Sequence, residues 1–561
     1  MMIRRDSRLA RHGEALVARY LKTGSWSRQP TIARFRAVVE EHGKRDAVIG
    51  RDGSMTYDDL DERSDQIAAW LIGNGLPVGG PVVVQASNSA ETVLAFYALL
   101  KSGAVPVAAL PAHRSHEIGH ISEIVQPVAH LVDTGVSDGV LTGIALANAA
   151  AHPSIQHLLA IGAASEDFPR LTDVGYDIPP ATARTRVDAV QESIHYEDVV
   201  VFQLSGGTTG TPKVIPRLHA EYWNNALFNS RALRRDWRSR TAHVMPILHN
   251  AGVVNALFGA HSVGGCVVPL PFGNHDDTIA ALVHAGVSDM MVISPMEPWF
   301  DHPRWNEVAA TLQFLIYSGS KPPSALVERI AAQNIWMGQT WGMAEGPYTT
   351  TRFAAPPDLR AASVGTPTFD SDDETLVVDP TTFGPLPNGQ TGLLAYRGPS
   401  TIAGYFDAAD HNATAFDDGF LLTGDMARVI DHAGLPYLAL EGRIKDVISR
   451  GAEKISTEEV EKLLRQHPEI VDAAVVAMPD ARLGERACAY VTLAGGVATI
   501  RLADVRDHFA ALGVAKFKWP ERLEIVDALP RTPTLKTDKV KLRQRIAARL
   551  VAEEGRERAQ V

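Results

Sequence analysis

Short apolar runs, each followed by turn residues and then a helix-like pattern, recur along much of this chain. They include PVVVQA, HLVDTG, HLLAIG, DVVVFQL, MMVISP and LQFLIYSGS. Between the runs, apolar residues recur at helical spacing, as in residues 57–72 and in ETVLAFYALLKSG. Strands that alternate with helices are typical of parallel sheets covered by helices. The alternation therefore predicts a mixed α/β core.

The length of 561 residues predicts more than one lobe, because it is several times the usual domain size. Between about residues 373 and 441, short strands with frequent Gly, Pro and Asp turns indicate a small antiparallel or barrel-like element. After GRIKDVISRG, residues 442–451, the pattern becomes that of a compact α+β unit. We therefore predict an α/β protein with a large N-terminal lobe of parallel-rich sheets (1–443) and a small, mobile α+β lobe (444–561).

Composition excludes several other classes. The formal charge of −11 and the pI near 6.0 disfavour nucleic acid as a partner. Cys266 and Cys488 are the two cysteines, so we expect no disulfide framework and a cytoplasmic location. No signal-peptide-like start and no run of about 18 apolar residues occurs, so we expect no membrane insertion.

The stretch SGGTTGTPKVIPR, residues 205–217, directly follows the run DVVVFQL. Loops at the carboxyl ends of strands are where α/β folds bind ligands. Its glycines let backbone amides approach a ligand closely, and its hydroxyls and lysine suit a polyphosphate. The spacing is neither a Walker loop nor a dinucleotide fingerprint, and alone it also fits a flexible surface turn. The nucleotide-binding candidates here are Ser205, Gly206, Gly207, Thr208, Thr209, Gly210 and Lys213.

This loop resembles the phosphate-binding signature of the adenylate-forming superfamily, which contains acyl- and aryl-CoA synthetases, stand-alone aryl-acid ligases, nonribosomal peptide adenylation domains and luciferases. Further stretches resemble the family's motifs in the same order, namely YSGSKPP, GQTWGMAEG, LLTGDMARV, LEGRIKDVISRGAEKIS and LPRTPTLKTDK. The resemblance extends from about residue 55 to 545. It implies an ATP-dependent acid-thiol ligase.

The resemblance also implies roles for single residues, most of which alone would be ordinary turn, surface or core positions. These are Lys536 as the catalytic lysine, Glu345 and Thr209 on Mg²⁺, Asp425 on the ribose, Trp341 against adenine, Arg443 on the nucleotide, Lys445 as the hinge, and Gly319, Ser320 and Gly342 around the nucleotide. It implies two half-reactions. A carboxylic acid and MgATP give acyl-AMP and pyrophosphate, and after the small lobe turns, a pantetheine thiol of CoA or of a carrier protein gives a thioester and AMP.

Within the family, PVAALPAHRSHEIGHI and the phosphate loop resemble aryl-acid ligases that load 2,3-dihydroxybenzoate or salicylate in siderophore assembly. In those relatives a His-Asn pair and a following aromatic residue form the acyl pocket. Here the pocket candidates are His249, which is also a catalytic candidate, Asn250, Ala251, Asn255 and Gly338. Ala251, and not an aromatic residue, follows the pair here, so the aromatic wall of the pocket is missing. We therefore hypothesise a bulkier acid, such as a polycyclic acid of a natural-product pathway (antibiotic or siderophore biosynthesis).

Several alternatives to this interpretation are left open by the sequence. Ala452 and Leu535 replace glycines usual in the family, so the enzyme could mainly perform the thioester half-reaction on a preformed acyl-adenylate. A non-catalytic nucleotide-binding protein is the alternative from another class, and a homodimer is possible. The three histidines His113, His116 and His120 could mimic a metal cluster, but helix surface and packing are favoured.

Overall fold

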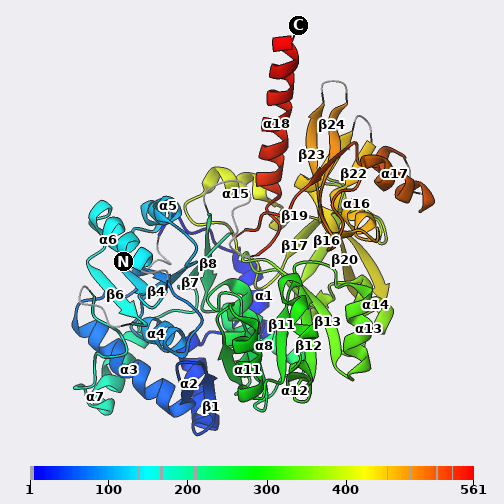
Figure 1. Ribbon diagram of the computed structural model, residues 1–561. Helices are drawn as coiled ribbons and strands as arrows, with labels where there is room; N and C mark the ends of the chain where they lie inside the picture. Colours follow the sequence, from blue (N-terminus) through cyan, green and yellow to red (C-terminus); the bar gives the residue numbers. More distant parts are fainter. Residues whose placement is uncertain are drawn as a thin grey trace.

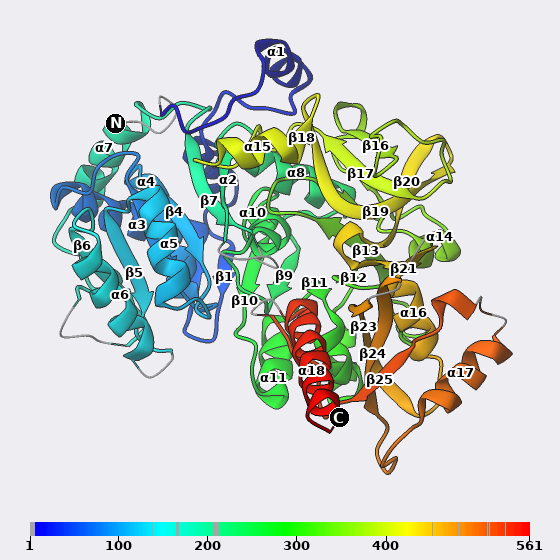
Figure 2. The ribbon, with the colours of Figure 1, turned by 90° about the horizontal axis from the view of Figure 1, so that it is seen from above.

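The computed structural model describes residues 6–136, 139–163, 168–205, 212–450, 453–480, 483–512, 514, 516–532 and 535–560. Four sheets run through these residues (Figures 1 and 2). Two are parallel-rich and packed with helices, one is antiparallel, and one lies in the last part of the chain. The predicted α/β fold class is confirmed.

The six-stranded sheet follows the order β6-β5-β3-β4-β7-β8 and is parallel except for β8 at its edge. Four of its strands are predicted apolar runs: β3 (Pro81–Gln85), β5 (Ala129–Asp133), β6 (His157–Ile161) and β7 (Val199–Leu204). The other two, β4 (Val105–Ala109) and β8 (Val214–Leu218), were not predicted. The helices of this region are α3 (Tyr57–Gly73), α4 (Ala90–Lys101), α5 (Ser115–Val125), α6 (Val140–Ala151) and α7 (Pro180–Gln191).

The nine-stranded sheet has a parallel centre and antiparallel margins. Its strands, in spatial order, are β15 (Thr366–Pro367), β14 (Tyr348–Thr350), β13 (Trp336–Gly342), β12 (Phe314–Ser318), β11 (Asp289–Val292), β9 (Arg240–His243), β10 (Cys266–Pro269), β1 (Asp46–Ile49) and β2 (Ser54–Thr56). The helices between them are α8 (Tyr222–Ala232), α9 (Asn250–Gly252), a π-helical turn (Val253–Leu257), α10 (Phe258–His261), α11 (His275–Ala285), a 3₁₀ segment (Ser294–Asp301), α12 (Trp305–Ala309), α13 (Ser324–Ala332) and α14 (Pro357–Ala362).

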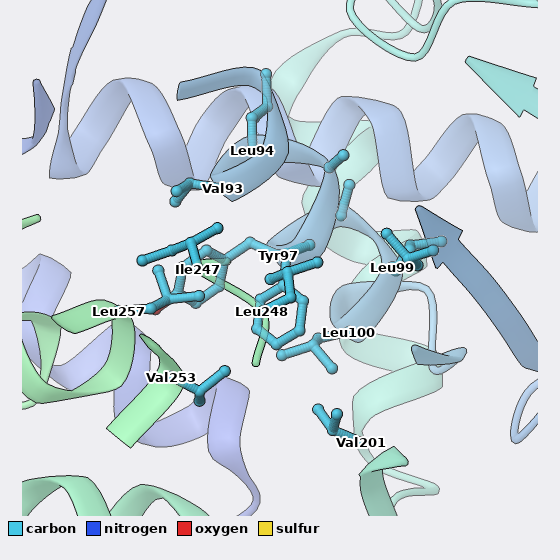
Figure 3. Packing of buried hydrophobic residues seen from close by; sticks show 14 of the residues in the cluster. Val93, Leu94, Tyr97, Leu99, Leu100, Val201, Ile247, Leu248, Val253 and Leu257 are labelled. Atoms are coloured by element: carbon cyan, nitrogen blue, oxygen red, sulfur yellow. The ribbon is translucent and has the colours of Figure 1, made fainter. Parts of the chain in front are cut away.

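Helix α4 packs between these two sheets. All of its residues except Glu91 are buried, which is the pattern of a helix covered on nearly every side. Figure 3 shows Val93 and Tyr97 of this helix beside Ile247 and Leu257. Because the contact is extensive and apolar, it fixes the segment 247–257, which carries the His-Asn pair.

The predicted antiparallel element is present as a five-stranded sheet of β16 (Glu374–Val378), β17 (Gly392–Arg397), β18 (Phe416–Asp417), β19 (Phe420–His432) and β20 (Leu435–Arg443), with α15 (Ala409–Ala415) beside it. The N-terminal helices α1 (Glu14–Thr23) and α2 (Thr31–His42) precede the sheets in the chain. Arg19 of α1 bonds to Asp372 and Glu374, which attaches this helix to the antiparallel sheet.

The last part of the chain forms its own sheet of β21 (Val447–Arg450), β22 (Glu453–Ser456), β23 (Ile470–Asp480), β24 (Gly484–Leu493) and β25 (Arg522–Ile525). Its helices are α16 (Thr457–Leu464), α17 (Leu502–Ala511) and α18 (Lys539–Gln560), and α18 projects from the body in Figure 1. A 3₁₀ turn (Ile444–Asp446) separates this sheet from β20. The division at residues 443 and 444 stays a prediction.

Candidate active site

The neck of the glycine-rich loop is closed by hydrogen bonds between its two ends. The amide of Ser205 donates to the carbonyl of Lys213 (3.0 Å), and the amide of Lys213 donates to Ser205 Oγ (2.9 Å). The neck lies at the carboxyl end of β7, as the sequence predicts. The candidates Gly206, Gly207, Thr208, Thr209 and Gly210 lie outside the described residues.

Tyr405 links Glu345 to the neck of this loop, because it contacts both Glu345 and Lys213. The Tyr405 hydroxyl donates to Glu345 Oε1 (2.7 Å), and Lys213 Nζ lies 5.4 Å from the centre of the Tyr405 ring. Glu345 is buried, and within the described part of the chain no group donates to its second oxygen, Oε2. Burial, with the Glu345 charge beside it, raises the pKa of the Tyr405 hydroxyl well above its usual range. A neutral hydroxyl therefore fixes the orientation of the Glu345 side chain.

Asp425 is held by two donors from different elements. Trp341 Nε1 of β13 donates to Asp425 Oδ2 (2.9 Å), and Arg443 Nε lies 2.9 Å from Oδ1. Asp425 and Arg443 are opposite each other in the register of β19 and β20. The three residues come from separate sequence motifs and are brought together by the fold. The buried carboxylate is thus fixed in one orientation.

Lys536 reaches this region from the last part of the chain. Its amide donates to Thr532 Oγ1 (3.2 Å), and its carbonyl accepts from the amide of Thr532 (2.7 Å), so the turn is closed. Desolvation by the surrounding protein lowers the pKa of Lys536, and repulsion from Arg443 lowers it further. The nearby charge of Asp425 acts in the opposite direction. Leu535 has a φ of 64°, in the left-handed region that favours glycine.

His249 and Asn250 begin the short helix α9. The amide of Ala251 donates to His249 Nδ1 (3.4 Å), so this ring caps the helix. Burial, then Lys536 and His113, lowers the pKa of His249 to about 4, which leaves the imidazole neutral at pH 7. Asn250 Oδ1 accepts from the Tyr222 hydroxyl (3.1 Å).

Arg217 is a site residue that sequence reasoning did not single out, although it ends the SGGTTGTPKVIPR stretch. It is 0 % exposed and makes a bidentate pair with Glu221 (2.9 and 2.7 Å). Its Nη1 also donates to Asn250 Oδ1 (2.7 Å) and to the carbonyl of Ala344 (3.2 Å). Arg217 therefore joins the strand after the phosphate loop to the segments that carry Asn250 and Glu345. The spacing of Arg217 and Glu221, four residues apart, was the signal available in the sequence.

The remaining acyl-pocket candidates lie on two elements. Asn255 is buried in the π-helical turn, accepts from Asn229 Nδ2 (3.0 Å), and donates to the Tyr348 hydroxyl. Gly338 lies in β13, where an added Cβ would come within 2.3 Å of the Trp336 ring. π-helical turns are frequent at functional sites. The pocket roles of these residues stay predictions.

The other nucleotide and hinge candidates are placed as follows. Gly319 has a φ of 84°, Ser320 Oγ lies 2.8 Å from Ser294 Oγ, and Gly342 is exposed at the end of β13. The side chain of Lys445 and all of Ala452 lie outside what the structure describes. Among the described residues no group of three or more His, Cys, Asp or Glu side chains could hold a metal ion.

Comparison with known proteins gives the family. The sequence model of the AMP-binding enzyme matches residues 35–406, and that of the AMP-binding enzyme C-terminal domain matches residues 459–536. The chain is 33% identical to the vibriobactin-specific 2,3-dihydroxybenzoate-AMP ligase of Vibrio cholerae over 95% of this chain and 96% of that protein. It is 35% identical to a salicylyl-CoA synthase / salicylate adenylyltransferase of a Streptomyces species, over 94% and 95% of the two chains. The apo structure of MbtA from Mycobacterium smegmatis superposes with a TM-score of 0.71 at 32% identity, covering 96% of this chain and 99% of that one.

The chain therefore belongs to the AMP-binding enzyme family, and the predicted resemblance to adenylate-forming aryl-acid ligases is confirmed. The family assignment also confirms the expectation of an ATP-dependent ligase. No helix in the described ranges is long and apolar enough to cross a membrane.

Proposed function

We propose that this enzyme activates a carboxylic acid with ATP and passes the acyl group to a pantetheine thiol. In the first step a carboxylate oxygen attacks the α-phosphorus and pyrophosphate leaves. In the second, the thiol sulfur attacks the acyl carbonyl, AMP leaves, and the thiol proton goes to solvent. The acceptor is CoA or a carrier protein, and the salicylyl-CoA synthase named above supports a thiol acceptor.

The observation that carries the proposal is the placement of Lys536. It comes from the last part of the chain and interacts electrostatically with His249, Asp425 and Arg443, which belong to three other elements. A cation that faces both the predicted acyl and ribose sites can stabilise the charge that develops between them. We propose that Lys445 is the hinge about which the small lobe, residues 444–561, turns for the second step.

The described residues also fit a hard divalent cation, and Mg²⁺ would balance the triphosphate charge when bound. Glu345 offers one carboxylate oxygen while Tyr405 occupies the other. Mg²⁺ is commonly held by one or two carboxylates together with phosphate oxygens, and the absence of a larger acidic cluster in the described residues agrees with that arrangement. Glu345 is thus the expected protein ligand, with Thr209 as the second candidate.

The proposal is tested with acid-dependent pyrophosphate release from ATP, using a panel from hydroxybenzoic to polycyclic acids. We expect release that requires an acid and that falls by at least 100-fold in Lys536→Ala, which removes the cation. Equal rates in Lys536→Ala and the parent enzyme would contradict the proposal. The best acid of the panel decides whether the missing aromatic wall admits a bulkier substrate.

The thioester-only alternative is tested at Leu535, whose left-handed backbone is a specific reason to keep it. We expect Leu535→Gly to change the adenylation rate by less than about tenfold, because the turn is already closed by Thr532. Supplied acyl-AMP serves as the control for the second half-reaction. Adenylation that appears only in Leu535→Gly, with thioester formation in both proteins, would favour the alternative.

A further inference from the structure

His243 is a buried histidine at the carboxyl end of β9. It is 1 % exposed, and neither Nδ1 nor Nε2 has a partner within the described residues. A neutral imidazole carries one donor and one acceptor nitrogen, and buried polar atoms are almost always paired. Two unpaired nitrogens on one buried ring therefore call for a partner other than the described residues.

The strand register places His243 on the side of the sheet that faces the π-helical turn. In the pairing of β9 with β11, Ala242 lies beside Met290, and both side chains belong to the apolar cluster on one face. Successive side chains of a strand alternate between faces, so His243 and Met291 lie on the opposite face. Met291 Sδ lies 4.0 Å from Asn255 Nδ2, which brings this face to a predicted pocket residue.

The neighbours of His243 on this face use their own hydrogen bonds elsewhere. Thr241 Oγ1 donates to Asp289 Oδ2 (3.2 Å), and Arg235 Nε donates to Asp289 Oδ1 (2.9 Å). Arg235 Nη1 also donates to the carbonyl of Asn255 (2.6 Å). This ion pair is complete without His243, so the unpaired ring is not part of it.

His243 is within electrostatic reach of His249, and Lys536 is among the groups that act on His249 but not among those that act on His243. His249 interacts electrostatically with Lys536, and His243 interacts with His249 and Arg235. Burial lowers the pKa of His243 to about 3, so the ring is neutral at pH 7. A neutral ring suits a neutral polar group rather than a second carboxylate, and a hydroxyl can both donate and accept.

We propose that His243 determines acid specificity by hydrogen bonding to a hydroxyl group on the acyl portion of the substrate, at the end remote from the carboxylate. This inference rests on the proposed function. It deepens that function by naming the substituent that the acid carries and the residue that recognises it. A site built to bond a hydroxyl rejects an analogue without one, because its polar atoms are then left unpaired.

The test uses pairs of aryl acids that differ by a single ring hydroxyl, including a bicyclic pair such as 2-naphthoic and 6-hydroxy-2-naphthoic acid. We expect the parent enzyme to favour the hydroxylated member of at least one pair by tenfold or more in kcat/KM for pyrophosphate exchange. In His243→Leu that ratio falls to near one, while the KM for ATP is unchanged. The Tm of His243→Leu rises, because an apolar side chain replaces an unpaired polar one. In His243→Gln, which keeps a donor and an acceptor, part of the ratio returns.

A matched control is His261→Leu, at a buried histidine whose ring is satisfied. His261 Nδ1 lies 2.7 Å from the Tyr97 hydroxyl, and Nε2 lies 2.9 Å from the carbonyl of Ala47. We expect this variant to lose stability and to keep the acid ratio. If His243→Leu keeps the parent's preference for the hydroxylated acid, or if the parent discriminates no pair, the inference about His243 is overturned and the proposed function stands. If no acid supports exchange, the proposed function is overturned and the inference with it.

Discussion

At the scale of single residues, the hydrogen bonds of Arg217 decide how the site is supported. Its guanidinium is fully buried and paired with Glu221, and it also bonds Asn250. Removing one partner of a buried ion pair costs about 3–5 kcal/mol, because the other charge remains buried without compensation. We therefore expect Arg217→Met to lower the free energy of unfolding by about that amount, measured by urea denaturation.

The double variant Arg217→Met/Glu221→Gln is the control for this prediction. The glutamine removes the negative charge that Glu221 would carry without its partner Arg217. It keeps an oxygen that can accept from the amide of Leu218, as Glu221 does at 3.1 Å. We expect the double variant to recover part of the lost stability. If single and double variants unfold at the same urea concentration, Glu221 is not stranded by the loss of Arg217.

At the scale of elements, the helical segment 250–261 depends on close backbone packing at Gly252. An added Cβ at this position would lie 2.4 Å from the carbonyl oxygen of Ile247, and the φ of −67° is ordinary. Space rather than backbone conformation therefore requires glycine here. We expect Gly252→Ala to cost about 1–3 kcal/mol of stability. The KM for the acid should rise because the turn that carries Asn255 must shift.

The control is Gly119→Ala in α5, where an added Cβ meets no atom within 4 Å. Alanine is favoured over glycine inside a helix by about 0.5–1 kcal/mol, so this variant should be at least as stable as the parent. Thermal denaturation and acid-dependent pyrophosphate exchange check both variants. Equal effects of the two substitutions would show that the carbonyl of Ile247 does not limit the space at Gly252.

Elements that depend on local pattern were predicted well, and those that depend on remote partners were not. The runs that became β3, β5, β7 and β12 are short, apolar and bounded by turn residues, so their sequence alone indicates strands. β1 was not predicted, because it is a strand of four residues that pairs with the short β2 on one side and, on the other, with β10, which lies more than 200 residues away in the chain. The same holds at the site. Trp341, Asp425 and Arg443 were each found by motif, but the bonds that join them depend on the fold.

At the scale of the whole molecule, acidic side chains meet on the two sides of the predicted hinge. Glu458 lies in the first turn of α16, in the last part of the chain, and Glu441 lies near the end of β20, before Lys445. Ser456 Oγ donates to the carbonyl of Glu441 (3.0 Å), which keeps these segments together. Burial, with Glu461 and Glu441 adding repulsion and Lys539 opposing it, raises the pKa of Glu458 to about 7. In this orientation of the two parts, Glu458 is therefore only partly ionised near neutral pH.

This raised pKa predicts a pH dependence with a definite sign. The ordinary pKa of a glutamate carboxyl is 4.5, and in the folded protein the pKa of Glu458 is about 7. The stabilising contribution of the protonated carboxyl is fully present below pH 4.5 and is lost as the pH rises through about 7. We expect the Tm of the parent protein to fall between pH 5.5 and pH 8, and Glu458→Gln to flatten that fall. Each kcal/mol relieved at pH 8 should raise the Tm by about 2–4 °C. Glu40→Gln, at an exposed position of α2, should leave the slope unchanged.

The same substitution connects stability with the two half-reactions. Ionisation of Glu458 beside Glu441 weakens the lobe orientation that places Lys536 near His249, so it should favour departure from that orientation. We therefore expect Glu458→Gln to raise the rate of pyrophosphate exchange relative to the rate of thioester formation from supplied acyl-AMP, with the larger difference above pH 7. Both rates are measured on one preparation across pH 6–8.5. A ratio that is unchanged by the substitution at every pH would separate Glu458 from the lobe movement and leave it with a role in stability alone.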